Sequence, residues 1–226
     1  MNFLSHYYFE RFAIQPEQVT GCILPDLLKN ASRDYAFRPE KRMGELEKRA
    51  GTLAIYEGWK RHVEVDRLFH GSSYFIDHCH VFRQRVIQPL QHTEIRTTFF
   101  AHVALELCLD HLLIREQLVN VDRLYENLEA TNPYTLKRFL HIIGLEDTSK
   151  YFYFHERFMA SRYIHQYAEV SSLVSAIVNV CRRLWTFSIS EEEKTELTLI
   201  FENYIQNNLQ DYREIFQYIQ DRLLAE

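Results

Sequence analysis

The chain has 226 residues, of which 46% are hydrophobic and 25% charged, and its formal net charge is −5 at pH 7. This length and composition fit one globular domain with a sizeable core, and the acidic balance disfavours a nucleic-acid binder. Six glycines and five prolines are too few for collagen-like repeats or a turn-rich β-sandwich. The four cysteines form no C-x-x-C pair, and the longest uncharged apolar stretch, Val170 to Cys181, is short for a membrane span. We therefore expect a cytoplasmic protein that does not cross a membrane.

Apolar residues recur at steps of three and four along most of the chain, which predicts helices rather than strands. In chain order, the expected helices cover about 52–70, 73–88, 94–119, a short segment from Asn132 to Gly144, 162–185 and 190–226. Ser190 and Glu193 form a capping-box pattern at the start of the last one. No alternating strand pattern with hairpin turns occurs. The expected fold class is all-α, as a single compact multi-helix domain over residues 1–226.

Two of the expected helices carry histidines and carboxylates at helical spacing. His62, Asp66 and His70 stand four residues apart, so a helix brings them to one face at steps of about 6 Å. Glu106 and Asp110 repeat this spacing on the helix 94–119. Because divalent metals accept imidazole and carboxylate ligands, a mononuclear or dinuclear site shared by the two helices is one interpretation.

The other interpretation is a set of surface ion pairs or buried hydrogen-bonded pairs. On the second helix, His111 lies next to Asp110, and His102 precedes Glu106 by one turn. Other catalytic patterns do not occur, since E-x-x-H, H-E-x-x-H, G-x-S-x-G and a glycine-rich phosphate loop are all missing from the sequence.

The segment from Lys29 to Arg61 is basic although the whole chain is acidic. It holds nine basic and five acidic residues, a local charge of +4. Such a segment is either a solvated surface or a docking patch for an acidic or phosphate-bearing partner.

Four short motifs follow one another within residues 1–115. The chain opens with MNFLSH, comparable with M-N-F/Y-L-A/S-H, and GCILPDLLK at 21–29 is comparable with G-N-L-L-x-D-F-V/L-K. GWKRHVEVDRLFH at 58–70 matches G-I-x-x-H-R-x-I-D-x-F/L-T-D at three positions, and ELCLDHLL at 106–113 is comparable with D-x-x-x-D-H-F-L. In order and content these motifs resemble the acyl carrier protein phosphodiesterase family. Residues 116–226 show only a helical pattern.

The resemblance implies an all-α, HD-domain-like fold and an enzyme related to the HD-domain metallophosphohydrolases. It also implies hydrolysis, with Mn²⁺ or Mg²⁺, of the phosphodiester that joins 4′-phosphopantetheine to a serine of holo-acyl carrier protein, a reaction of lipid metabolism. The basic segment 29–61 would then steer the acidic carrier protein toward the site.

The expected site residues follow from the matched motifs and from the chemistry of phosphodiester hydrolysis. We expect metal ligands at Asp26, His62, Asp66 and Asp110. We expect proton-handling residues at His111, His70 and His6. Substrate contacts are expected from Lys29, Arg61 and Glu106.

The chain also departs from the family pattern. Cys22 replaces Asn, Val63 replaces an Arg suited to phosphate, Phe69-His70 replaces Thr-Asp, and Glu106 replaces Asp. Two alternatives therefore stay open. One is an HD-like phosphohydrolase acting on a nucleotide or another small phosphoester, and the other is a non-catalytic helical binding protein. The aromatic segment 151–167 is core, an acyl-chain groove or a dimer surface.

Overall fold

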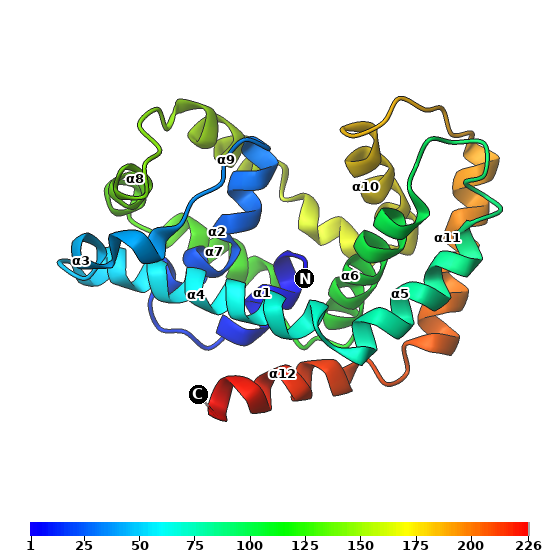
Figure 1. Ribbon diagram of the computed structural model, residues 1–226, viewed down its shortest axis with the longest axis horizontal. Helices are drawn as coiled ribbons and strands as arrows, with labels where there is room; N and C mark the ends of the chain where they lie inside the picture. The colour runs from blue at the N-terminus through cyan, green and yellow to red at the C-terminus, as the bar shows by residue number, and fades with distance from the viewer. Residues whose placement is uncertain (226) are drawn as a thin grey trace. The chain divides into compact units, whose positions relative to one another are not determined.

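The structure, a computed structural model, describes residues 1–225, and within them it contains helices joined by loops and no strand (Figure 1). The predicted all-α class is confirmed. The helices group into two compact units. Unit 1 comprises Met1–Asn2, Asp66–Leu118 and the residues from His165 onward, and unit 2 comprises Phe3–Val65 and Val119–Ile164. The expectation of one domain over 1–226 stays a prediction.

Unit 2 is built around α2. Its elements are α1 (Phe3–Glu10), α2 (Pro16–Ala31), η1 (Pro39–Arg42), α3 (Met43–Leu46), most of α4 (Ala50–His70), α7 (Val121–Ala130), α8 (Pro133–Ile142) and α9 (Ser149–Ser161). The apolar face of α2 packs against α1, α7 and α9. Helix α4 approaches α2 so closely that a Cβ at Gly58 would lie 2.0 Å from the backbone oxygen of Gln18. Glycine is therefore required where these two helices meet.

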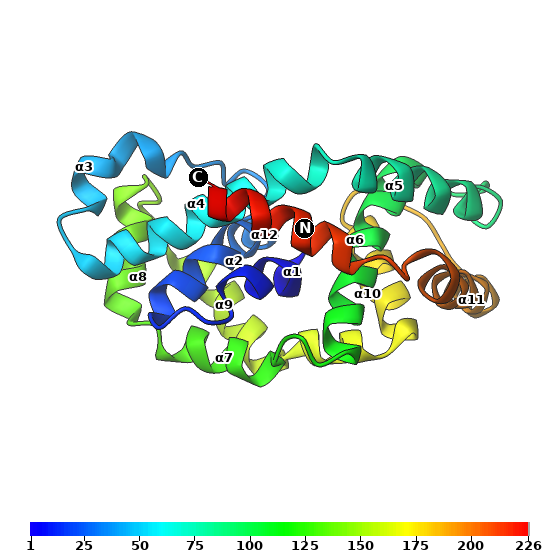
Figure 2. The same ribbon diagram turned by 90° about the horizontal axis from the view of Figure 1, so that it is seen from below.

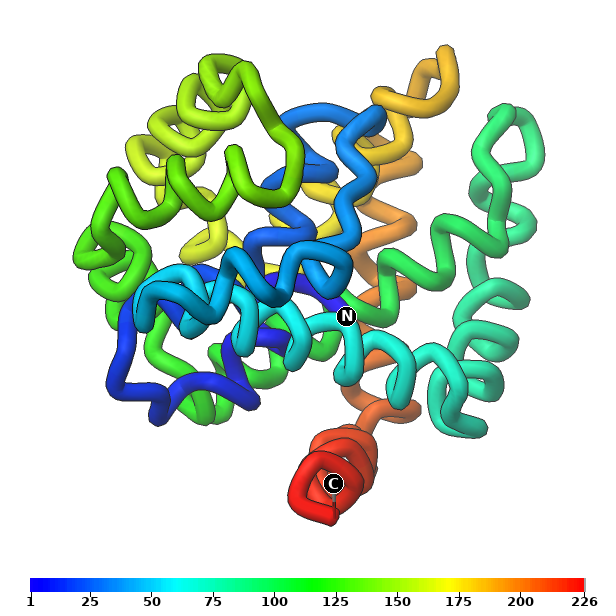
Figure 3. The backbone as a smooth tube through the Cα atoms, turned by 60° about the vertical axis from the view of Figure 1, so that its left-hand side comes forward, coloured from blue at the N-terminus to red at the C-terminus, as the bar shows by residue number. Residues whose placement is uncertain are grey.

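Unit 1 is built around α6. Its elements are the last turn of α4, α5 (Ser73–Val86), α6 (Thr97–Arg115), most of η2 (Tyr163–Ala168), α10 (Val170–Arg182), α11 (Glu191–Asn208) and α12 (Arg213–Ala225). The chain turns back between α5 and α6, which pack against each other (Figure 3). Helix α10 packs against both α6 and α11. The site described below lies in unit 1, where the end of α4 meets α6.

Helix α6 is mostly apolar. Within residues 1–225 it is the one helix that is long and apolar enough to cross a membrane, with a mean hydropathy of 1.4 over its best window. That window is 67% buried within the protein, and the core helix of a globular protein meets the same criteria.

The sequence pattern located α4, α5, α6 and α8, did not identify α1, α2, α3, α7 and α9, and was wrong about the continuity of the two expected helices after residue 160. The expected helix 190–226 is broken at Leu209–Tyr212 into α11 and α12 (Figure 2). Leu209 and Tyr212 are both buried at the break, so the apolar stripe continues through a segment that is not helical. The expected helix 162–185 is likewise interrupted, because Glu169 has extended backbone angles between η2 and α10. An apolar stripe predicts which residues are buried, but it does not reveal a break in the helix.

Candidate metal centre

Two histidines and one glutamate of unit 1 converge on one point. His70 is the last residue of α4, and His102 and Glu106 lie one turn apart on α6. The Nε2 atoms of His70 and His102 are 3.0 Å apart. Oε1 of Glu106 is 2.9 Å from His102 Nε2 and 3.2 Å from His70 Nε2. We call these three residues the His–His–Glu cluster.

Local sequence holds the cluster in place. Helix α4 ends at His70, where Gly71 follows, and the side chain of Ser72 accepts a hydrogen bond from the backbone N–H of Phe75 at the start of α5. The ring of Phe75 then packs edge-on against the imidazoles of both His70 and His102, with centroids 4.9 Å away in each case. This apolar contact limits the rotation of both ligand rings.

The hydrogen bond at the far side of His70 fixes its tautomer. Nδ1 of His70 lies 2.8 Å from the backbone oxygen of Asp66, and a carbonyl oxygen only accepts, so Nδ1 carries the proton. The lone pair of Nε2 in the neutral ring then points into the cluster. Histidines that bind metals are usually oriented by such a bond from the other ring nitrogen.

The amino group of Met1 pairs with two carboxylates beside the cluster, where a metal ion would have to compete with it. The amino group of Met1 lies 2.6 Å from Oδ1 of Asp66 and 3.1 Å from Oε1 of Glu106. Burial alone would raise the pKa of Glu106, but the Met1 amino group and a hydrogen bond from His102 outweigh it and hold the pKa well below its usual range. Glu106 is therefore ionised at neutral pH and presents a negative charge to the two imidazoles.

The three donor atoms fit the spacing of metal ligands. Two ligands at right angles, each about 2.1 Å from an ion, lie about 3.0 Å apart. The measured separations of 2.9, 3.0 and 3.2 Å agree with that spacing. The side chains of His70 and His102 are 32% and 39% exposed, which leaves room for water or substrate on the open side. These residues could hold a divalent metal ion.

Two other expected site residues of unit 1, Asp110 and His111, follow Glu106 on α6. Asp110 is fully buried on α6, and its Oδ2 accepts a hydrogen bond from the side chain of Asn2 at 3.0 Å. His111 donates from Nδ1 to the backbone oxygen of Tyr167 at 2.9 Å, and burial lowers the pKa of its imidazole. His111 lines a separate hollow with Glu116, so it is not one of the three converging side chains.

Unit 2 brings together a second group of expected site residues. The imidazoles of His6 on α1 and His62 on α4 stack with centroids 3.7 Å apart. His62 donates from Nδ1 to the backbone oxygen of Cys22 at 2.8 Å, which leaves its Nε2 4.0 Å from Oδ1 of Asp26.

The two expected phosphate-binding residues are placed differently from each other. The guanidinium of Arg61 forms an ion pair with Glu10 at 3.1 Å, so a phosphate would compete with this carboxylate. Lys29 is exposed, and its ammonium donates to the backbone oxygen of Arg33 at 3.3 Å.

His102 is the cluster residue to which sequence reasoning assigned no role. His70 was expected to handle protons and Glu106 to contact substrate, whereas the geometry gives both of them donor positions beside His102. The signal that could have identified His102 is its spacing of four residues from Glu106, the same spacing that links Asp66 to His70.

Comparisons with known proteins identify no relative of this chain. No protein-family model matches the chain, and neither a curated protein nor a solved structure matches it.

Proposed function

We propose that this chain is a divalent-metal-dependent phosphodiester hydrolase, similar to the acyl carrier protein phosphodiesterases, that releases 4′-phosphopantetheine from the serine of holo-acyl carrier protein. The observation that carries the proposal is the His–His–Glu cluster, with three donor atoms 2.9 to 3.2 Å apart. The four motifs in family order support the same conclusion, because one of them contains His70 and another begins at Glu106.

In this proposal His70, His102 and Glu106 hold the ion. Two imidazoles with one carboxylate favour Mn²⁺ over Mg²⁺, because Mg²⁺ prefers an all-oxygen environment and imidazole suits the transition metals. When bound, the ion would neutralise a phosphoryl oxygen and lower the pKa of water.

Asp66 takes the role of proton acceptor that we had expected of His111. Oδ1 of Asp66 is 2.6 Å from the Met1 amino group, which also lies 3.1 Å from Oε1 of Glu106, and the Asp66 side chain is 35% exposed, so Asp66 can contact a solvent molecule near the cluster. His111 is committed to Tyr167 and lines a different hollow. In this position Asp66 would orient a water molecule for attack on the phosphodiester and accept its proton.

The basic segment 29–61 is the proposed docking surface for the acidic carrier protein. Its residues lie in unit 2 on α2, η1, α3 and α4 and on the loops between them. The exposed bases are Lys29, Arg33, Arg38, Lys41, Arg42, Lys48, Arg49 and Lys60. Because exposed charges are screened by salt, affinity for the carrier protein should fall steeply as ionic strength rises.

The test is intact-protein mass spectrometry of holo-acyl carrier protein incubated with this protein and Mn²⁺. The expected result is a metal-dependent loss of the phosphopantetheine mass that the wild type and Glu94→Gln produce and Glu106→Gln does not. Glu94 is an exposed residue of unit 1 and serves as the matched control.

Two other results would select the alternatives. Hydrolysis of small phosphodiesters or nucleotides, with holo-carrier protein left intact, would identify a phosphohydrolase with another substrate. Protein that neither binds a metal nor hydrolyses either substrate would be a helical binding protein.

A further inference from the structure

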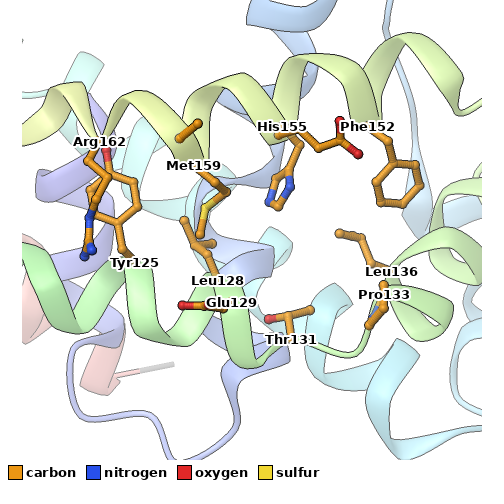
Figure 4. A pocket seen from close by; sticks show the side chains of 12 residues that line it. Tyr125, Leu128, Glu129, Thr131, Pro133, Leu136, Phe152, His155, Met159 and Arg162 are labelled. Atoms are coloured by element: carbon orange, nitrogen blue, oxygen red, sulfur yellow. The ribbon is translucent and has the colours of Figure 1, made fainter.

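Unit 2 contains a cavity of its own between α7, α8 and α9, with a volume of about 570 Å³ (Figure 4). Cavities that bind small molecules in proteins usually have volumes of about 300 to 1,000 Å³. The lining runs along α9 from Phe152 to Ala160, about 12 Å at the rise of an α-helix. The space is therefore large enough for a small molecule and elongated along the helix.

The walls of this cavity are mainly apolar. Leu128 comes from α7, Leu136 from α8, and Phe152 and Met159 from α9, and their side chains project into the space between the helices (Figure 4). The space is open to solvent, since Glu129, Glu156 and Ala160 of its lining are exposed, so its apolar side chains are accessible to a ligand.

A histidine side chain reaches into the cavity. The imidazole of His155 extends from α9 into the space (Figure 4), and its Nε2 atom is buried with no hydrogen-bond partner among residues 1–225. Burial lowers the pKa of this histidine, so its ring is neutral at pH 7. Buried polar atoms nearly always have a partner, and the side of the ring that faces the cavity is where a ligand would supply one.

The charged groups of the lining disfavour an anion. Glu129 and Glu156 both contribute carboxylates to it. The one cation in the lining, Arg162, donates to Oδ1 of Asp122 at 3.1 Å, and its guanidinium lies 4.8 Å from the centroid of the Tyr125 ring. A ligand with a carboxylate or phosphate would therefore meet two negative charges and a guanidinium that already has a partner.

We propose that this cavity binds an elongated, uncharged and mainly apolar molecule whose single hydroxyl or amide group forms a hydrogen bond with Nε2 of His155. The proposal is independent of the metal centre, since all the residues that carry it belong to unit 2. It gives the aromatic segment 151–167 a binding role in addition to its contribution to the core.

Methionine methyl resonances provide the test. The chain has three methionines, Met1, Met43 and Met159, and of these only Met159 lines the cavity. In full-length protein labelled with ¹³C at the methionine methyl groups, titration with 1-octanol should shift the Met159 resonance and leave the other two in place. Octanoate, which has the same chain length but a negative charge, should shift it much less.

Three variants separate the parts of the proposal. Ala160→Phe places a ring in the cavity and should abolish the shift, whereas Ser161→Phe, at the next position of α9, which does not line the cavity, should keep it. His155→Leu should lower the affinity for 1-octanol relative to 1-chlorooctane by roughly fivefold, the effect of one lost hydrogen bond. An unmoved Met159 resonance up to the solubility limit of 1-octanol, an equal response to octanoate, or an unchanged affinity ratio in His155→Leu would each overturn the proposal.

Discussion

Replacing His102 with alanine should remove most of the stabilisation that Mn²⁺ gives to the folded protein. His102 supplies one of the three donor atoms of the His–His–Glu cluster, and its side chain is 39% exposed. The substitution therefore takes away a ligand without opening a cavity in the core. Its effect on the protein without metal should be small, within about 0.5 kcal/mol of unfolding free energy.

The size of the effect follows from linkage. An ion at one hundred times its Kd stabilises the folded state by about 2.7 kcal/mol. For a chain of 226 residues this corresponds to a rise in Tm of about 5 to 10 °C. If loss of His102 weakens binding about 100-fold, the same concentration of Mn²⁺ gives about 0.4 kcal/mol, or a rise of about 1 °C.

The assay is thermal unfolding of chelator-treated protein with and without Mn²⁺, on the wild type, His102→Ala and His80→Ala. His80 is an exposed histidine of α5 and controls for the loss of an imidazole in the same unit. A full rise in Tm for His102→Ala, or an equal loss of the rise for His80→Ala, would refute the assignment of the ligands.

Three further predictions concern the fold. Gly58→Ala should destabilise the protein by about 3 kcal/mol, because its Cβ would meet backbone atoms of α2, whereas Gly44→Ala, with nothing within 4 Å, should be close to neutral in urea unfolding; equal urea midpoints for the two variants would contradict this packing. Ser190→Ala should cost about 1 kcal/mol in the same assay, since it removes the capping box of α11, and an unchanged midpoint would contradict that role. Burial lowers the pKa of His155 below the unfolded value of about 6.5, so on acidification the unfolded chain takes up a proton at this residue before the folded protein does. The contribution of His155 to the free energy of unfolding is therefore fully present above about pH 6.5 and is lost as the pH falls below it. His155→Leu should therefore lose less stability than the wild type between pH 7 and pH 5, and parallel urea midpoints would count against a neutral buried imidazole.

Helical periodicity was enough to predict the fold class and several of the helices, but not α1, α2, α3, α7 or α9. The helices expected at 52–70 and 73–88 correspond to α4 and α5, and Gly71 separates them. The break at Leu209–Tyr212 could not be predicted, because it depends on partners far along the chain. There, Tyr212 donates to Oε2 of Glu116, and the guanidinium of Arg85 donates to the side chain of Asn208.

The sequence predicted which two helices carry the candidate site, but not which three side chains converge there. Spacing of four residues on two helices identified Asp66, His70 and Glu106 as neighbours of a metal site. Which atoms converge depends on where α4 ends and on the ring of Phe75, and neither can be calculated from spacing on one helix. The role of His102 became visible only when α6 was placed beside the end of α4.

The most direct test of the central claim, that His70, His102 and Glu106 bind one divalent ion, is to count the imidazoles on that ion. Electron spin echo measurements on Mn²⁺-loaded protein should detect couplings to two histidine nitrogens in the wild type and to one in His102→Ala. An ion with no imidazole coupling, or with the same two couplings after His102 is removed, would contradict the account.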